Sequence, residues 1–476
     1  MISPSTILKH VLYVMLFSIF IFLYFYNYNN IEFFLIFDLI FLFLNIFFLR
    51  GVTKNLIYII FNLMIFLFLL SRPLIEYLYK IDYWDVGLEF YVTSLFIIGL
   101  SLFSINIGYS VNNKLILKNE IYKLSKRSEN ILFFIVLCLW IINFIVGLDR
   151  YLLLRNLSYT DNYLAFQGRL PSFLVSISAF YIYFFIFFLA AVPNPKRRIL
   201  VIIFHLLSLV PALLIGERNG VGQFFIFLIL YYILLNKNIG LGNNISLKRI
   251  FYIILFSISL IALFNYVGNL REKNSDVDII SSQPYEKNAI VKFLYLQGTS
   301  FYTIVQGLEI EQLLPNREDK VYSFGMAIDS LLHNSISSKI FSFPELGSGN
   351  NMLAVLNSNN LAHPLSYLVM GDSYLMGHGR GTSYVLENYL DFGFLGVVIL
   401  SAILGRVISC LNNSLFFKSY YIRIFALLTM LNLILLPRYT YSGFFYYFFD
   451  IKFIISITIM FFIDKLFSEY KVTNYE

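Results

Sequence analysis

The sequence is a succession of apolar segments, each about long enough to cross a bilayer, joined by polar connections. Only 13% of the residues are charged, against roughly a quarter in soluble domains. These features predict an all-α polytopic integral membrane protein with about twelve transmembrane helices. The candidate spans lie near residues 8–26, 31–49, 55–71, 88–108, 131–148, 171–192, 199–215, 221–235, 250–267, 390–411, 422–437 and 444–464.

Basic residues in alternate connections set the expected orientation, because loops rich in Lys and Arg stay in the cytoplasm. We expect both termini to be cytoplasmic, with helices 1–9 in residues 1–267, a large extracytoplasmic loop in 268–389, and helices 10–12 with the cytoplasmic tail in 390–476. No small-residue cleavage site follows the first apolar stretch, which predicts a retained span. The net charge of +7 is explained by these loops, and we expect no nucleic-acid partner.

The predicted loop at 268–389, about 120 residues long, exceeds an ordinary connection and should contain structure of its own. Helical spacing marks 289–314, interrupted by Gly298, and a second short helix at 323–333. The end of the loop and the start of the next span read GDSYLMGHGRGTSYVLENYLDFGFLG. This is a glycine-rich polar stretch that becomes an apolar helix from about Thr382. Ionisable groups beside a bilayer are costly to desolvate, so this stretch is a candidate functional segment.

Three residues in this stretch carry the predicted chemistry. The glycines of 377–381 expose backbone amides before a helix start, which favours an anion site that includes Arg380. His378 is the candidate general base, since a neutral imidazole accepts a hydroxyl proton near neutral pH. Glu387 would orient the histidine, pair with an arginine or accept a proton. The structural alternatives are a helix cap, a surface histidine and a carboxylate in an ordinary ion pair.

Arginine is enriched in the segments assigned to the outer side, where its planar fork matches phosphate oxygens. Glu217 and Arg218 occupy the tight turn GERNG between two spans, and Arg438 opens the turn before the last span. Arg155 and Arg169 lie in an amphipathic stretch at 149–170. These five residues are the predicted contacts to a phosphate-bearing glycan substrate; chance, salt bridges and membrane-anchoring arginines are the alternatives.

This combination of features resembles bacterial O-antigen polymerases of the Wzy type, which are related to O-antigen ligases. The resemblance rests on GERNG between two spans, SYVLENYLDFGFLG after a His/Arg segment, and one large outward loop before the last spans. The family has a pattern like S-R-G where this chain has Glu217 to Gly220. The family also has an E-x-x-x-x-G-x-x-G-like run after a His, and here Gly393 follows Glu387 by six residues rather than five. By the resemblance, Arg218 would bind pyrophosphate and His378 would be the base.

The resemblance implies polymerisation of undecaprenyl-pyrophosphate-linked oligosaccharide repeat units into O-antigen or capsular-type polysaccharide at the outer face of the bacterial inner membrane. A glycosyl pyrophosphate already has a good leaving group, so arginines and one base suffice. We therefore expect no cofactor and no metal. The expected partners are the lipid-linked donor and acceptor, membrane lipid, a chain-length regulator and a flippase.

Three other functions remain open at this point. A ligase that attaches finished polymer uses nearly the same chemistry. A lipid-linked oligosaccharide flippase or other transporter would favour charges within spans, short loops and inverted repeats. A transferase that uses a lipid monophosphate sugar would carry an acidic pair in its first outward loop, where this chain has Glu32 alone, although Asp82 and Asp85 follow in the second.

Overall fold

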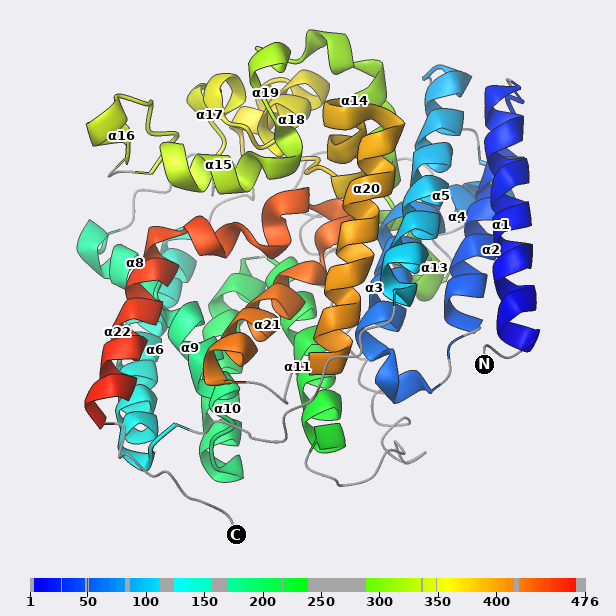
Figure 1. Ribbon diagram of the computed structural model, residues 1–476. Coiled ribbons are helices and arrows are strands. Elements are labelled where there is room, and N and C mark those ends of the chain that lie inside the picture. The colour runs from blue at the N-terminus through cyan, green and yellow to red at the C-terminus, as the bar shows by residue number, and fades with distance from the viewer. Residues whose placement is uncertain are drawn as a thin grey trace.

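The computed structural model describes residues 4–26, 28–47, 49, 51–81, 86–111, 124–155, 169–215, 217–238, 288–334, 337–347, 349–414 and 419–467. The regular secondary structure of these residues is helical, with no strand among them (Figure 1). Within them, six helices are long and apolar enough to span a membrane: Leu56–Tyr79, Leu88–Ser110, Lys126–Leu154, Ser172–Ala190, Pro195–Leu214 and Tyr384–Asn412. The all-α membrane fold is confirmed, and the count of twelve spans stays a prediction, with 250–267 outside the described residues.

The helical bundle is built from three stretches of the chain. The first comprises α1 (Pro4–Phe25), α2 (Ile31–Phe47), α3 (Leu56–Ile65), the π-helical turn η2 (Phe66–Leu70), α4 (Ser71–Tyr79) and α5 (Leu88–Ser110). The second comprises α6 (Lys126–Leu154), α8 (Ser172–Ser178), α9 (Tyr181–Ala190), α10 (Pro195–Leu214) and α11 (Asn219–Asn238). The third comprises α20 (Tyr384–Ser414), α21 (Tyr420–Leu433) and α22 (Ile451–Phe467).

Helix α20 packs closely against α5 because glycines let the two backbones approach. A Cβ on Gly108 would overlap the carbonyl oxygen of Ala402, and one on Gly405 would overlap that of Ile105. The Ser101 hydroxyl also lies 2.7 Å from the Tyr384 hydroxyl, at the first turn of α20. The start of α20, which follows the glycine-rich stretch, is therefore fixed against the first stretch of the bundle.

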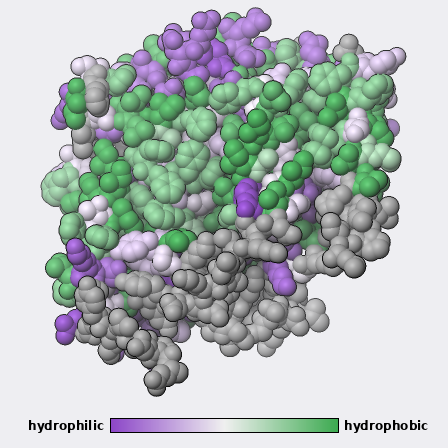
Figure 2. Space-filling model, in the orientation of Figure 1, coloured by the Kyte–Doolittle hydropathy of each residue, from purple (hydrophilic) through white to green (hydrophobic). Residues whose placement is uncertain are grey.

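A layer of short helices lies over one end of the bundle (Figure 1). It contains α15 (Gly325–Leu332), α16 (Ser337–Phe341), α17 (Met352–Asn357), α18 (Ala362–Met370) and α19 (Asp372–Leu375). Hydrophilic residues gather over this layer, above a broad apolar band (Figure 2). The first turn of α1 and the last turn of α22 lie at the other end of the bundle (Figure 1). The two described ends of the chain are thus on the same side.

The predicted helices at 289–314 and 323–333 are confirmed. The first is α13 (Ala289–Gln297) followed by α14 (Ser300–Glu309), with the break at Gly298, and the second is α15. The apolar helix expected from about Thr382 begins at Tyr384, and it is interrupted where the sequence pattern predicted continuity. Gly393 has φ +61° and ψ −155°, a conformation that is essentially restricted to glycine.

The residues of α20 just before Gly393 hold the segment that leads into α15. Arg317 donates to the Leu390 carbonyl just before the break and lies 3.5 Å from the carboxylate of Asp391. The same carboxylate accepts the backbone N–H of Tyr322 at 3.2 Å and that of Ser323 at 2.6 Å. The segment that precedes α15 is therefore anchored to the first half of α20.

Candidate active site

The turn between α13 and α14 organises the site through its contact with α4. Gly298 lies against the backbone there, because a Cβ would be 2.6 Å from the nitrogen of Arg72. Arg72 donates to the hydroxyl of Thr299 at 3.2 Å and to that of Tyr295 at 3.0 Å, and it forms an ion pair with Glu76 at 2.9 Å. Since Arg72 is only 6% exposed, these bonds fix the turn firmly against α4.

Arg438 contacts the residue just before this turn. Its Nη1 donates to Oε1 of Gln297 at 3.2 Å, and its guanidinium lies 5.2 Å from the centre of the Phe68 ring. Burial and, next, the positive charge of Arg218 lower the pKa of Arg438. Unlike Arg72, Arg438 forms no ion pair with a carboxylate in the part of the chain that the structure describes.

Glu217 and Arg218, adjacent in the sequence, have different neighbours. The Glu217 carboxylate pairs with Arg150 of α6 at 2.6 Å, whereas the charge of Arg218 acts on Arg438. The Arg218 carbonyl accepts the Gly222 N–H at 3.1 Å in the first turn of α11. The GERNG turn therefore joins α6 through Glu217 and places a cation near Arg438 through Arg218.

Arg380 approaches this region from the glycine-rich stretch. Its N–H donates to the Ser366 hydroxyl at 3.0 Å, and its carbonyl accepts from Thr303 of α14 at 3.4 Å. A Cβ on the next residue, Gly381, would be 3.6 Å from the carbonyl oxygen of Arg438, and Gly381 has φ +77°, which favours glycine. The stretch therefore runs alongside the backbone at Arg438.

Three arginines, Arg72, Arg380 and Arg438, thus contact α14 or the residues just before it. The charge of Arg218 acts on Arg438, and we refer to these four residues as the arginine cluster. Burial and then the charge of Arg72 lower the pKa of Arg380, just as Arg218 acts on Arg438. Cations held close together repel each other, and a bound anion relieves that cost. Guanidinium groups match phosphate oxygens in charge and geometry, so the arginine cluster is a candidate phosphate site.

His378 is held two residues before Arg380 by its backbone. Its N–H donates to the Ser373 carbonyl at 3.1 Å, and its carbonyl accepts from the side-chain amide of Asn350 at 2.8 Å. The other two histidines of the predicted loop make structural bonds: His333 to the Pro344 carbonyl at 2.7 Å and His363 to the Tyr374 hydroxyl at 2.8 Å. His378, which is half-buried, remains the candidate base.

Glu387 is fully buried and joins two segments that carry arginines. One carboxylate oxygen accepts from the Thr382 hydroxyl at 3.0 Å. The other accepts from the Thr440 hydroxyl and from the Tyr441 N–H, each at 2.8 Å. Thr382 follows Arg380, and Thr440 follows Arg438, by two residues each. The carboxylate therefore holds together the two backbone segments that present Arg380 and Arg438.

Arg155 and Arg169 are exposed at the end of the bundle where α6 finishes. The Arg169 N–H donates to the Asp149 carboxylate at 3.3 Å, and the Arg155 N–H donates to the Tyr151 carbonyl at 2.9 Å. Among the described residues, no hydrogen bond joins either of them to the arginine cluster. Arg169 is thus joined to Asp149, which precedes Arg150 in the sequence, and Arg150 pairs with Glu217.

The sequence prediction omitted the residues that place the cluster. Arg72 was counted only among the outer arginines, and Gln297, Thr299 and Tyr295 were not singled out. Their contacts to Arg72 and Arg438 join residues more than a hundred positions apart, which helical periodicity does not report. The one local signal was Gly298, which interrupts an otherwise helical pattern.

Comparison with known proteins gives one match that covers nearly the whole chain. No curated protein matches the sequence, and no solved structure matches it either. The family model described as O-antigen polysaccharide polymerase Wzy matches residues 9–471.

Proposed function

The chain belongs to the O-antigen polysaccharide polymerase Wzy family, and on that premise we propose that it polymerises repeat units carried on undecaprenyl pyrophosphate at the outer face of the bacterial inner membrane. The observation that carries the proposal is the placement of Arg438. Arg438 has no carboxylate partner among the described residues, and the positive charge of Arg218 acts on it. These features favour a role in binding an anionic ligand over a role in a structural ion pair.

The reaction transfers a glycan from one lipid pyrophosphate to the sugar end of another lipid-linked unit. The bond between the anomeric carbon of the donor and its phosphate oxygen breaks, and a hydroxyl oxygen of the acceptor forms the new glycosidic bond. The leaving lipid diphosphate gains negative charge, which Arg438, Arg218 and Arg380 stabilise where it develops. His378 takes the proton of the acceptor hydroxyl.

Glu387 acts in this proposal as a positioning residue. Its two oxygens receive three hydrogen bonds from the segments behind Arg380 and Arg438. Because it is completely buried, it lies behind these segments and holds them at a fixed separation. A rigid arrangement matters here, since donors aimed in advance at developing charge need no reorganisation during the reaction.

The remaining predicted residues belong to the approach to this site. We assign Arg155, Arg169 and Glu217, with Arg150, to the entry of the lipid-linked substrate, at the end of α6 next to the GERNG turn. The outer-face location is supported by the polar layer on the same end of the bundle and by the described chain ends on the other (Figures 1 and 2). A chain-length regulator and a flippase are the expected partners.

A deletion of the gene, with gel analysis of surface polysaccharide, tests the function. Polymerase activity predicts loss of the ladder of chain lengths with a single repeat unit retained. Loss of every attached unit would instead indicate a ligase, and accumulation of inward-facing lipid-linked units would indicate a flippase. Restoration of the ladder by the wild-type gene and not by Arg438→Ala would connect the function to the arginine cluster.

A further inference from the structure

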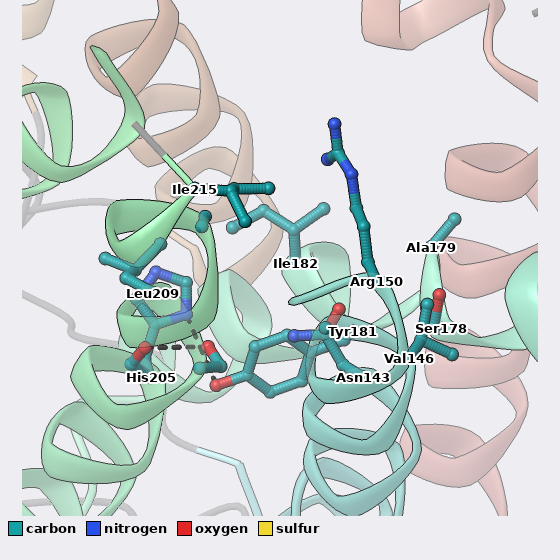
Figure 3. A pocket seen from close by; sticks show the side chains of 13 residues that line it. Asn143, Val146, Arg150, Ser178, Ala179, Tyr181, Ile182, His205, Leu209 and Ile215 are labelled. Carbon is teal, nitrogen blue, oxygen red and sulfur yellow. Dashed lines mark hydrogen bonds between the residues drawn. The ribbon is translucent and has the colours of Figure 1, made fainter. Parts of the chain in front are cut away.

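A cavity of about 350 Å³ lies between α6, the region of α8 and α9, and α10. Figure 3 shows its lining, with Arg150 rising from α6 and His205 and Leu209 on α10. Much of its wall is apolar: Val146, Gly147, Ile182, Leu209, Ala212 and Ile215. Its volume falls near the lower end of the roughly 300–1,000 Å³ found for small-molecule pockets.

The cavity lies between the two least buried of the six candidate spans of the described residues. Only 11% of the apolar window of α6 and 28% of that of α10 are buried within the protein. Towards the other end of α6, the Trp140 ring stacks on Phe204 at 4.3 Å and its N–H donates to the Phe204 carbonyl at 2.5 Å. This contact joins α6 to α10 on the N-terminal side of Asn143, and the cavity ends there.

Two polar residues of the wall, His205 and Ser208, have hydrogen-bond partners within the protein. The Nδ1 atom of His205 lies 3.3 Å from the Tyr181 hydroxyl, and the Ser208 hydroxyl donates to the His205 carbonyl at 2.7 Å. The His205 ring also stacks on Phe185 at 4.3 Å. A hydrocarbon ligand would therefore leave these groups bonded, which avoids the cost of a buried polar atom without a partner.

Charge is concentrated at one rim of the cavity. Arg150 lines the rim and pairs with Glu217 at 2.6 Å, and both side chains keep about 40% exposure, 37% and 41%. Arg218, the next residue, contributes to the arginine cluster. An amphiphile with an anionic head at these arginines would place the start of its tail in the cavity.

We propose that this cavity binds the isoprene units nearest the pyrophosphate of the lipid carrier, an inference that rests on the proposed function. The volume suits part of one chain, whereas a phospholipid carries two acyl chains from one head group. The tail would hold the donor so that its pyrophosphate reaches Arg218 and Arg438. Binding of the tail would then contribute to affinity for the donor and not to the chemical step.

Photo-crosslinking tests the site in the full-length protein in phospholipid vesicles. The probe is a polyprenyl pyrophosphate with a diazirine in its first isoprene units. We expect adducts on the parts of α6 and α10 around 143–150 and 205–215, removed by unlabelled polyprenyl pyrophosphate and not by added phospholipid. Ala212→Phe fills the cavity. At probe concentrations below saturation, this variant should lower labelling about tenfold, which is the effect of losing two buried methylene contacts.

Val210→Phe is the matched control, because Val210 lies on the same helix, is 44% exposed and does not line the cavity. Gly147→Val fills the cavity from α6 and serves if Ala212→Phe fails to fold. Even labelling of all lipid-facing helices, or equal labelling of the two phenylalanine variants, would overturn the inference. If the labelling is specific but the deletion strain still makes an intact ladder, the lipid site would stand and the polymerase proposal would be wrong.

Discussion

Burial and, next, the positive charge of Arg218, more than two hundred residues earlier in the sequence, lower the pKa of Arg438. Arg438 is held in place by neutral neighbours, Gln297 and the ring of Phe68. Two cations of which one acts on the other in this way favour a bound anion. The predictions below follow from that relationship and from the contacts that maintain it.

Arg438→Ala should reduce polymer formation by about a hundredfold to a thousandfold, the usual cost of removing one donor to developing charge. Arg438→Lys should recover only part of the activity, since an ammonium lacks the planar fork. The measurement is the rate of chain extension in membranes that contain equal amounts of each variant. Arg197→Lys is the control, because the Arg197 side chain is 40% exposed and lies 3.6 Å from Glu129. An active Arg438→Ala variant would exclude this residue from the site.

His378→Ala should abolish chain extension while protein level and membrane insertion stay unchanged. The reason is that the acceptor hydroxyl would lose the group that takes its proton. The rate of donor turnover, in membranes that contain equal amounts of each protein, measures this effect. A His378→Ala variant that keeps the wild-type rate would show that another group takes the proton.

Substitutions of Glu387 separate a positioning role from proton transfer. Glu387→Gln keeps an oxygen with two acceptor lone pairs, so this variant should retain much of the activity. Glu387→Ala loses all three hydrogen bonds and should destabilise the protein by about 3 kcal/mol or more. Thermal unfolding and chain extension are measured together. Equal loss of activity in both variants, with Glu387→Gln as stable as wild type, would instead indicate that the carboxylate transfers a proton.

Gly298→Ala should disturb the arginine cluster without changing any charge. The new methyl group would lie 2.5 Å from the Cβ of Arg72 and 2.6 Å from its nitrogen, so the turn has to move away from α4. We expect a loss of about 1–3 kcal/mol in stability and lower activity. Gly220→Ala is the matched control for stability, since nothing lies within 4 Å of its added Cβ. Equal unfolding temperatures for the two variants would contradict the close contact.

His363 should make the layer of short helices sensitive to acid. Burial lowers the pKa of His363, with a smaller opposing effect of Asp329, so the folded protein binds its proton less readily than the unfolded chain. The stability contributed by the neutral ring is therefore complete above about pH 6.5 and declines as the pH falls below that value. His363→Gln should flatten this part of the curve of unfolding temperature against pH. An unchanged slope would assign the acid sensitivity to other groups.

Local patterns in the sequence predicted much of the fold and part of the site. Apolar length and helical spacing gave the membrane helices, α13, α14 and α15, because these depend on neighbouring residues. The glycine-rich stretch indicated backbone that needs glycine, and Gly377 and Gly381 do have positive φ. The break at Gly393 was missed, since a helical apolar pattern continues on both sides of it.

These local patterns could not identify the interaction partners of the charged residues. Both Glu217 and Arg218 were predicted to contact the substrate, yet Glu217 pairs with Arg150 of α6 and the charge of Arg218 acts on Arg438. Glu387 was expected to orient the histidine, pair with an arginine or accept a proton, and its observed partners, Thr382, Thr440 and Tyr441, were not predicted. Packing of distant segments decides such contacts, and the sequence does not order those segments in space.

A double-mutant cycle on Arg218 and Arg438 tests the central claim most directly. The quantity is kcat/KM for a lipid-pyrophosphate donor, measured for wild type, Arg218→Ala, Arg438→Ala and the double variant. If both arginines bind one pyrophosphate, each single change removes most of the benefit and the double variant loses much less than the product of the two losses, a coupling of about 1–3 kcal/mol. Losses that simply multiply, or single variants as active as wild type, would contradict the account.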